Sequence, residues 1–422
     1  MSEQIPANEP AIDRPPVTAD VMPPTVDAEG APQTSIGRFK LPTETLRAYT
    51  MLFALVVIWL FLQWMTMTPD HPYGLFLDPV NFSKLLKQTA VTGILAVGML
   101  MVIVAGQIDL SVGSVVGLAG GMAALAQGWG LVPSLLTAIV VGVVIGMIQG
   151  SLVAYMNIPS FIVTLGGMLA WRGAVLWKMQ GRTVTIELPV YRSIGEGFVA
   201  PIAGVVLAAL AIAALIFFTL RRNRARRRHG LTPSGLTATV ARIVIPSIVI
   251  AVFIYMMNTQ GGVPLPVFIF LTVALAGAFL TQSTTFGRYL YAVGGNPDAA
   301  RLSGINLRRH ILLTFCLMGA MAGIGALVYT ARNGSAAGDA GTLLELDAIA
   351  ACVIGGTSLM GGRGTIFGAC LGALIMASLD NGMSLLSMSL LQTEHSTEMQ
   401  MIVKGAVLVA AVGFDMLGRR RS

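Results

Sequence analysis

The amino-acid sequence predicts an all-α integral membrane protein, a polytopic bundle of about ten to twelve transmembrane helices. Hydrophobic residues make up 55% of the 422 positions and charged residues only 11%, about half the charged fraction of an ordinary soluble domain. Water therefore cannot be the solvent for most of the surface. The apolar runs are long and do not alternate, which excludes the short alternating strands of a transmembrane barrel.

Apolar runs separated by polar residues, glycine or proline predict where the chain crosses the membrane. Candidate spans lie at 48–67, 88–105, 110–127, 131–154, 161–179, 199–220, 241–257, 265–282, 311–331, 344–360, 363–380 and 401–417. Two pairs of these spans have very short links, Gln107 to Asp109 and Gly361 to Gly362. Segments 88–127 and 344–380 therefore either cross fully or re-enter, and ten full spans remain possible.

The distribution of charge predicts the orientation. With the N-terminus inside, most of the 27 Lys and Arg residues fall on the cytoplasmic side, many of them in a basic loop at 221–240, so both termini are expected in the cytoplasm. Residues 1–47 are polar and Pro-rich, which predicts a disordered cytoplasmic tail before a transmembrane domain at 48–418. The tail has an acidic start, unlike a signal peptide.

The net charge of +7 could indicate nucleic-acid binding, but the basic residues cluster between apolar runs, where membrane topology explains them. No nucleic-acid partner is expected. The run RRNRARRRH at 221–229 could bind anionic lipid or a partner, yet anchoring of a cytoplasmic loop explains it without a further assumption. Cys316, Cys352 and Cys370 all lie in apolar runs, which predicts small buried thiols and no metal site.

Two segments carry an acid at the head of a small-residue helix. Asp109 begins the apolar part of AGQIDLSVGSVVGLAGG, residues 105–121, and Asp347 lies in LLELDAIAACVIGGTSLMGGRG, residues 343–364. An acid at membrane depth needs a reason. Asp109 is either a helix N-cap, which is the favoured interpretation, or part of a translocation path or gate. The similarity of the two segments hints at an internal repeat.

Two further features have mainly structural interpretations. Arg172 either extends to the outer membrane surface, which is favoured, or pairs with an acid inside the bundle. Gly142, Gly146 and Gly150 lie on one helix face and predict close approach of a second helix backbone.

The loop TTFGRYLYAVGGNPDAARLSGINLRRH, residues 284–310, predicts a short cytoplasmic helix. Asn296 can cap a helix that begins at Pro297, and Gly304 suits its end. So short a helix needs a surface to dock against. It either packs under the bundle or inserts into a cytosolic partner.

The sequence contains no GxxxxGK[ST] phosphate loop and no Ser/His/Asp or Cys/His set in a plausible soluble domain. The chain is therefore not expected to be an enzyme or to hydrolyse ATP itself.

Four segments, GQIDLSVGS, NIPSFIVTLGGMLAWRG, GRYLYAVGGNPDAARLSGIN and ELDAIAACVIGGTSLMGG, resemble those of the ribose/xylose/galactose branch of ATP-binding-cassette importer permeases. The resemblance runs from about residue 85 to the C-terminus. Within the branch it is strongest to the D-xylose permeases, through DNGMSLL, IVKGAVL and the Arg-rich loop with its extra pair of spans. The long Pro-rich tail and Gln107 depart from the usual pattern.

The resemblance implies a permease subunit in the bacterial inner membrane that imports a monosaccharide, D-xylose above all, by alternating access. It further implies a second copy of this chain, a cytosolic ATPase and a periplasmic sugar-binding protein as partners. The chain would bind no cofactor, because the partner ATPase uses the ATP and Mg. No metal ligand and no catalytic residue follow from the family pattern.

Site residues carried over from the family fall into two sets. Coupling to the ATPase would involve Gly295, Asn296, Ala299, Ala300, Arg301, Leu302, Ser303 and Gly304. The substrate path would involve Asp109, Ser111, Asn157, Thr164 and Asp347.

Three alternatives remain. The first is a permease of the same kind for another sugar, such as ribose or galactose. The second is a secondary sugar symporter, which would need a proton or sodium relay, and few acids lie deep in the spans. The third is an assembly subunit that transports nothing.

Overall fold

The computed structural model describes residues 33–36, 39–69, 71–228, 235–387, 398, 400–407, 409 and 413. The chain divides into two units, residues 1–46 and 47–422. In the first unit, β1 (Gln33–Ile36) and β2 (Phe39–Pro42) pair in antiparallel fashion. These strands and the start of α1 (Thr43–Met65) occupy the end of the tail predicted to be disordered. The rest of that tail lies outside the described residues.

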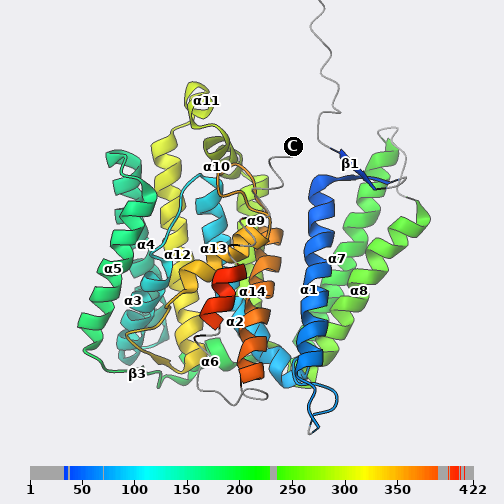
Figure 1. Cartoon of the computed structure of the whole chain (residues 1–422), viewed down its shortest axis with the longest axis horizontal. Coiled ribbons are helices and arrows are strands. Elements are labelled where there is room, and N and C mark those ends of the chain that lie inside the picture. Colours follow the sequence, from blue (N-terminus) through cyan, green and yellow to red (C-terminus); the bar gives the residue numbers. More distant parts are fainter. Residues whose placement is uncertain are drawn as a thin grey trace, which may run out of the picture. The chain divides into compact units, whose positions relative to one another are not determined.

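The second unit is helical, and among its described residues the named strands form two short antiparallel pairs (Figure 1). In chain order its elements after α1 are α2 (Pro79–Val104), α3 (Val112–Leu125), η1 (Ala126–Trp129), α4 (Leu131–Met156), α5 (Ser160–Met179), β3 (Val184–Thr185), α6 (Pro189–Glu196), β4 (Phe198–Val199), α7 (Pro201–Arg228), α8 (Leu236–Asn258), β5 (Val263–Pro264), α9 (Leu265–Ser283), α10 (Thr285–Gly295), α11 (Pro297–Leu302), α12 (Leu307–Asn333), β6 (Ser335–Ala336), α13 (Leu344–Ile354) and α14 (Ile366–Leu386).

Among the described residues, 9 helices are long and apolar enough to cross a membrane: α2, α3 continued by η1, α4, α5, α7, α8, α9, α12 and α14. The apolar part of α1, Thr50–Met65, is shorter. The chain is therefore a multi-pass, all-α membrane protein, as predicted. Within the span expected at 401–417, residues 401–407, 409 and 413 are described and are helical, and the other positions lie outside the described residues.

The candidate span at 344–360, for which the sequence left open a full crossing or a re-entrant segment, does not form a spanning helix. α13 has only 11 residues, about 16 Å of helix. It ends at Ile354 because Gly355 and Gly356 follow, the latter at φ +84°. The chain still passes from β6, which pairs with β3 at one end of the bundle, to Gly362, whose N–H donates to the Val104 carbonyl at the other end (2.9 Å). Segment 337–362 thus traverses as a short helix flanked by non-helical chain.

The basic segment predicted as a loop at 221–240 is mostly helical. α7 continues through the arginines to Arg228, and α8 begins at Leu236. Only residues 229–235 are left for the connection. Arginine is a good helix former and no glycine or proline interrupts the run, so the helix has no local reason to stop at the membrane boundary.

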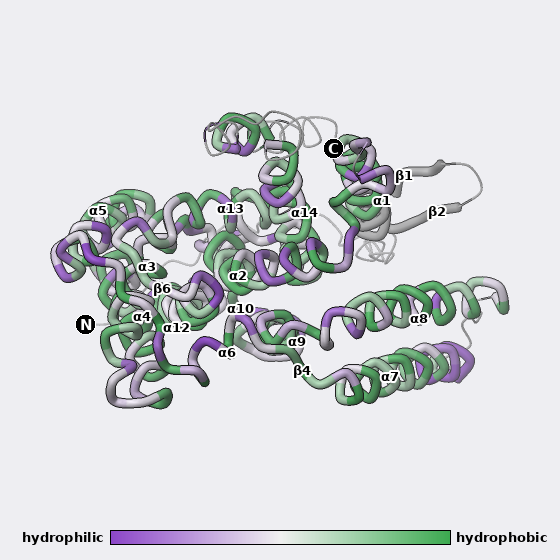
Figure 2. The backbone as a smooth tube through the Cα atoms, turned by 90° about the horizontal axis from the view of Figure 1, so that it is seen from below, coloured by the Kyte–Doolittle hydropathy of each residue, from purple (hydrophilic) through white to green (hydrophobic). Residues whose placement is uncertain are grey.

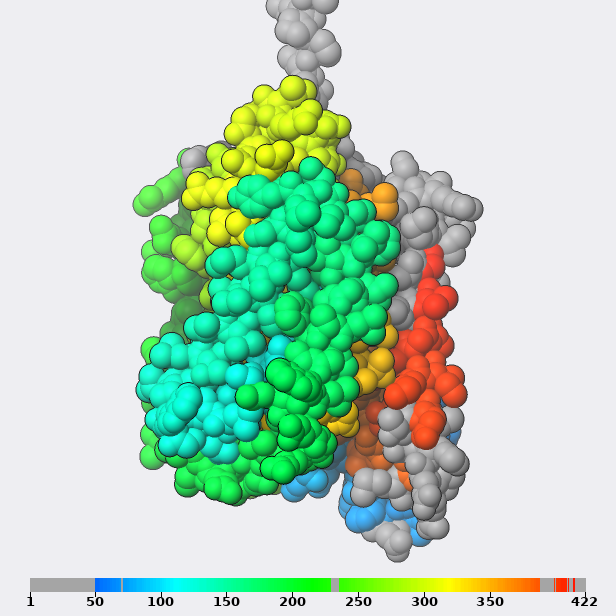
Figure 3. Space-filling view, turned by 90° about the vertical axis from the view of Figure 1, so that its left-hand side faces the viewer, coloured from blue at the N-terminus to red at the C-terminus, as the bar shows by residue number. Residues whose placement is uncertain are grey.

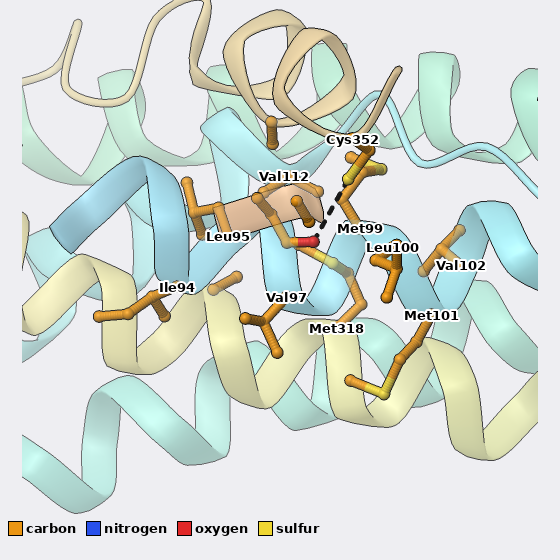
Figure 4. Packing of buried hydrophobic residues seen from close by; sticks show 14 of the residues in the cluster. Ile94, Leu95, Val97, Met99, Leu100, Met101, Val102, Val112, Met318 and Cys352 are labelled. Carbon is orange, nitrogen blue, oxygen red and sulfur yellow. Dashed lines mark hydrogen bonds between the residues drawn. The ribbon is translucent and has the colours of Figure 1, made fainter. Parts of the chain in front are cut away.

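α2 is the centre of the helix packing. Within its apolar window 89% of the residues are buried, and α12, α14, α9 and α13 pack against it. The largest buried cluster gathers side chains from these helices, including Leu95, Met99 and Met318 (Figure 4). Cys352 is fully buried there and its thiol donates to the Ala96 carbonyl at 3.3 Å. All three cysteines are free; Cys352 is buried as predicted, whereas Cys316 and Cys370 are only partly buried.

Small residues let the helices approach one another, which matters because lipid supplies no hydrophobic drive for helix association. α12 packs along α4. A Cβ on Gly142 would overlap the Gly319 carbonyl, and one on Gly146 would overlap the Phe315 carbonyl. The close approach predicted for this glycine face is confirmed, and the partner is α12.

Candidate functional site

The link between α2 and α3 is a non-helical stretch that buries Asp109. α2 ends at Val104, and Gly106 turns the chain at φ +76°. Asp109 is 4% exposed. Its Oδ1 accepts hydrogen bonds from the Ser111 N–H (2.8 Å) and the Ser111 hydroxyl (2.7 Å). The N-cap of α3 is Ser111 rather than Asp109, but Asp109 holds that residue, so its carboxylate does stabilise the start of the helix.

Side chains from α4 and α5 complete a buried polar cluster around this link. The Gln149 amide donates to Ser111 Oγ (2.9 Å). The Ile108 N–H donates to Ser160 Oγ (3.1 Å), and the Thr164 hydroxyl donates to the Ser160 carbonyl (2.9 Å) and toward the Ile108 carbonyl (3.3 Å). Three elements are thereby held together by side-chain hydrogen bonds inside the bundle.

The structure therefore brings together three of the residues predicted for the substrate path, Asp109, Ser111 and Thr164. It adds Gln149 and Ser160, which the sequence argument missed. Gln149 had a visible signal, a lone amide in the apolar run GMIQGS. Ser160 had none, because a serine at the start of a helix is common.

Asn157 lies apart from this cluster. It is exposed and forms the C-cap of α4 in the left-handed conformation, at φ 54°. Asparagine is one of the few residues that adopts this conformation readily. In this structure its evident role is to end α4.

A small cavity lies beside the Asp109 cluster. Its volume is about 10 Å³, room for about one water molecule. Its lining comes from α3, α4 and α12 together with the link: Asp109, Val112, Val115, Ile145, Gly146, Gln149, Met318, Gly319 and Ala322. The bundle is closed to a sugar at this point in the conformation described.

Asp347 belongs to a second, separate charged cluster. Lys404 Nζ lies 2.9 Å from Asp347 Oδ1 and 3.0 Å from Asp380 Oδ2. The two carboxylates come from α13 and α14, so one ammonium group joins three segments of the chain. Asp347 is 3% exposed. Burying these charges costs less when they are paired in this way.

Arg172 departs from both interpretations offered above. Its Nη1 donates to the carbonyl of Ala340 (2.7 Å) and of Gly338 (3.2 Å). It neither extends freely to the membrane surface nor forms an ion pair within the described residues. Instead it holds the non-helical chain before α13 against α5, because α12 and α13 leave those carbonyls without helical partners.

The short helix predicted after Asn296 is present as α11. Asn296 Oδ1 accepts the Ala299 N–H (3.0 Å), the Ser303 hydroxyl donates to the Ala299 carbonyl (2.9 Å), and Gly304 follows at φ +81°. Of the eight residues predicted to couple to an ATPase, only Ala300 is buried. The rest, including Leu302 at 86% exposure, are free to meet a partner. Residues around position 300 project beyond α4 and α5 (yellow in Figure 3).

Backbone contacts connect α10, which leads into α11, with the α2–α3 link. A Cβ on Gly294 would overlap the Val104 carbonyl. One on Gly361 would lie 2.7 Å from the Gly294 carbonyl and 3.0 Å from Gly106 Cα. The turn at Gly361 and Gly362 is therefore wedged between α10 and the end of α2. Any displacement of α10 must move the backbone that leads to Asp109, since no side chain lies between to absorb it.

The fold has a central helix, broken segments with buried polar groups and an exposed loop helix, and this combination is that of a membrane transport subunit. The chain belongs to the family described as branched-chain amino acid transport system / permease component. The model of that family matches residues 81–227 and 229–412. Such a component is a transport subunit and not a hydrolase.

Sequence similarity to named permease proteins extends over nearly the whole chain. It is 43% identical over 392 residues to the xylose transport system permease protein of Escherichia coli, covering 92% of this chain and 96% of the relative. It is 42% identical to the corresponding protein of Haemophilus influenzae, covering 91% of this chain and 100% of the relative. The ribose import permease protein of Escherichia coli is 34% identical, covering 91% and 98%. No solved structure matches.

Proposed function

We propose that this chain is the membrane-spanning permease subunit of an ATP-driven importer of D-xylose in the bacterial inner membrane. The observation that supports this most directly is 43% identity to a xylose permease against 34% to a ribose permease, at almost equal coverage. Permeases that share a fold and differ in substrate are expected to differ in sequence identity in this way, because the substrate is determined by residues of the site and not by the fold.

The partners that we infer are a cytosolic ATPase, a periplasmic sugar-binding protein and a second copy of this chain. The family supports the first two in general terms. The exposed, capped helix α11 supports a docking partner on its side, since a helix of 6 residues is marginal alone. The ATPase would use ATP and Mg, and both termini would lie on its side of the membrane.

We infer that α11 passes motion from the ATPase to the α2–α3 link. The close backbone contacts among Gly294, Gly361 and Gly106 provide a path by which a displacement of α10 can reach this link. Movement along it would shift Asp109 and Ser111 relative to Gln149 on α4 and Ser160 on α5. Opening this hydrogen-bonded cluster is one way in which a closed bundle could admit a sugar during alternating access.

The polar residues available to sugar hydroxyls support a carbohydrate path. Asp109, Ser111, Thr164 and Gln149 offer carboxylate, hydroxyl and amide groups in an otherwise apolar bundle. Asp347 lies in the broken segment around α13, and discontinuous helices commonly form transporter substrate sites. In this proposal affinity lies mainly in the binding protein, so these residues guide the sugar without holding it tightly.

The decisive experiment is uptake of labelled D-xylose at micromolar concentration in cells with and without the gene. Ribose and galactose serve as competitors. Loss of high-affinity uptake on deletion, with competition by xylose alone, supports the proposal. Better competition by ribose or galactose changes the substrate and keeps the family. Unchanged uptake of every sugar would favour an assembly role.

A secondary symporter is distinguished by its energy source. Uptake through an ATP-driven importer survives a protonophore as long as cellular ATP is maintained, whereas a proton symporter stops at once. Dependence on a separate ATPase gene would make the same distinction genetically.

A further inference from the structure

Apart from the end of α8, where Met257 is buried against α1 and α2, the α7–α8 hairpin has little protein around it. In the apolar windows of α7 and of α8 only 6% of residues are buried, against 89% for α2. Both helices are hydrophobic along their length (green in Figure 2), and the hydrophilic colour is concentrated at one end of α7. Helices that are apolar on every side and unburied must have lipid as their solvent.

The length of α7 places its charged end at the lipid headgroups. Pro201 to Leu220 spans about 30 Å of helix, which equals the hydrocarbon thickness of a bilayer. The following residues to Arg228 add about 12 Å, more than the 5–7 Å depth of one headgroup layer. This end of α7 lies at the same end of the bundle as α11 (Figure 1). The arginines therefore begin at the headgroups and extend just past them.

Among the residues that the structure describes, no acidic side chain pairs with the arginines at the end of α7. The run contains Arg221, Arg222, Arg224, Arg226, Arg227 and Arg228, of which all but Arg226 are exposed. None of them forms an ion pair within the described residues. The sequence holds no Asp or Glu anywhere between Glu196 and Asp298, so neither the hairpin nor its loop can neutralise them.

We propose that the arginine end of α7 is a binding surface for anionic glycerophospholipid, whose phosphates neutralise the run while its acyl chains lie along the apolar part of the same helix. Arg221, Arg224 and Arg228 lie on one helix face with Phe217 and Leu220, at spacings of three and four residues, and all five line the same surface hollow. One phospholipid can meet both kinds of side chain on this face, because its headgroup and its acyl chains join at the depth of Arg221. An acidic cytosolic protein would match the arginines alone and leave the apolar stripe unexplained.

The test compares lipid retention by the full chain and by two double variants. Arg224→Gln/Arg228→Gln removes two charges from the proposed surface and keeps good helix formers there. Arg308→Gln/Arg309→Gln removes two exposed charges from the start of α12 at the same end of the molecule. Each purified protein is incubated in mild detergent with equal amounts of phosphatidylglycerol and phosphatidylethanolamine, and bound lipids are counted by native mass spectrometry.

The unmodified chain is expected to retain phosphatidylglycerol in clear preference to phosphatidylethanolamine. Each basic residue at an anionic surface contributes a factor of about five, so the α7 variant should lower that ratio roughly tenfold or more. The α12 variant should leave it within about twofold, and raised salt should weaken the preference of the unmodified chain.

Three results would overturn the proposal. The first is equal preference in the unmodified chain and the α7 variant. The second is displacement of the lipid by inorganic phosphate at millimolar concentration, which would indicate a free-anion site. The third is a co-purifying acidic protein that the α7 variant loses while its bound lipid is unchanged.

Discussion

Gly294 offers a sharp test of the contact between α10 and the α2–α3 link. A Cβ at this position would overlap the Val104 carbonyl and would lie 2.9 Å from the Gly362 N–H nitrogen. Both neighbours are backbone, which cannot rotate aside as a side chain can. Gly294→Ala must therefore shift α10 or the adjoining turn, and overpacking of this kind costs about 1–3 kcal/mol.

Gly166→Ala on α5 is the matched control. An added Cβ there meets nothing within 4 Å. Both positions are helical, so both gain up to about 1 kcal/mol from the better helix propensity of alanine. The difference in the free energy of unfolding between the two variants thus isolates the overpacking.

Thermal unfolding of the purified chain in detergent, followed by tryptophan fluorescence at one heating rate, measures this difference. Gly294→Ala should melt on the order of a few degrees below Gly166→Ala and should transport less xylose per molecule in the membrane. Equal melting temperatures for the two variants would refute the wedged contact. A lower melting temperature with undiminished uptake would keep the contact and remove its role in coupling.

The remaining predictions concern caps and charges. Lys404→Met leaves Asp347 and Asp380 buried without their shared ammonium, which should destabilise the chain by about 3–5 kcal/mol; adding Asp347→Asn should restore part of the melting temperature, and no recovery would argue against the ion pair as the cause. Asn296→Ala removes the cap of α11, worth about 1 kcal/mol, and should lower uptake at unchanged membrane level, whereas Asn296→Asp, also a good cap, should retain it; equal loss in both variants would mean that capping is not what matters. Asp109→Asn keeps an oxygen for the Ser111 N–H, so its free energy of unfolding should lie within about 1 kcal/mol of that of the unmodified chain. Asp109→Ala should lower the free energy of unfolding by roughly 1–3 kcal/mol. Equal melting temperatures for the two variants would show that the turn does not depend on this acceptor.

The helices and their local signals could be predicted from the sequence. Long apolar runs determine most of the spans, because a run of that length has no other stable solution in lipid. The cap of α11 could also be predicted, since Asn296, Pro297 and Gly304 each act within one or two turns of their own position. The glycine face on α4 predicted close approach but could not name α12.

The broken segment around α13 could not be predicted from apolar length. Residues 344–360 are as hydrophobic as a spanning helix, but glycines end it early, and Arg172 supplies donors for the carbonyls that precede it. Those donors come from a helix far away in the sequence. Local propensity gives no sign that such a tertiary partner exists.

The candidate site was predictable in part. Asp109 and Ser111 could be predicted because they are polar residues at the start of an apolar run, and Thr164 was predicted from the family resemblance. Gln149 and Ser160 join them only through packing of α4 and α5. Lys404 likewise meets Asp347 across 57 positions of sequence, and no spacing rule connects the two.

The base of the α7–α8 hairpin has a consequence for how this fold can vary. β4 pairs with β5, and the Leu265 N–H donates to the Gly197 carbonyl at 2.8 Å, so the hairpin leaves and rejoins the bundle at a single point. Segments whose two ends meet in this way are easily gained or lost. Residues 201–262 therefore form an exchangeable cassette, and replacing them with a tight turn would keep the order of the other helices and would remove the packing of Met257 against Leu62 and Phe82. Two importers with the same transport path can thus differ in their number of spans and in their contacts with the surrounding lipid.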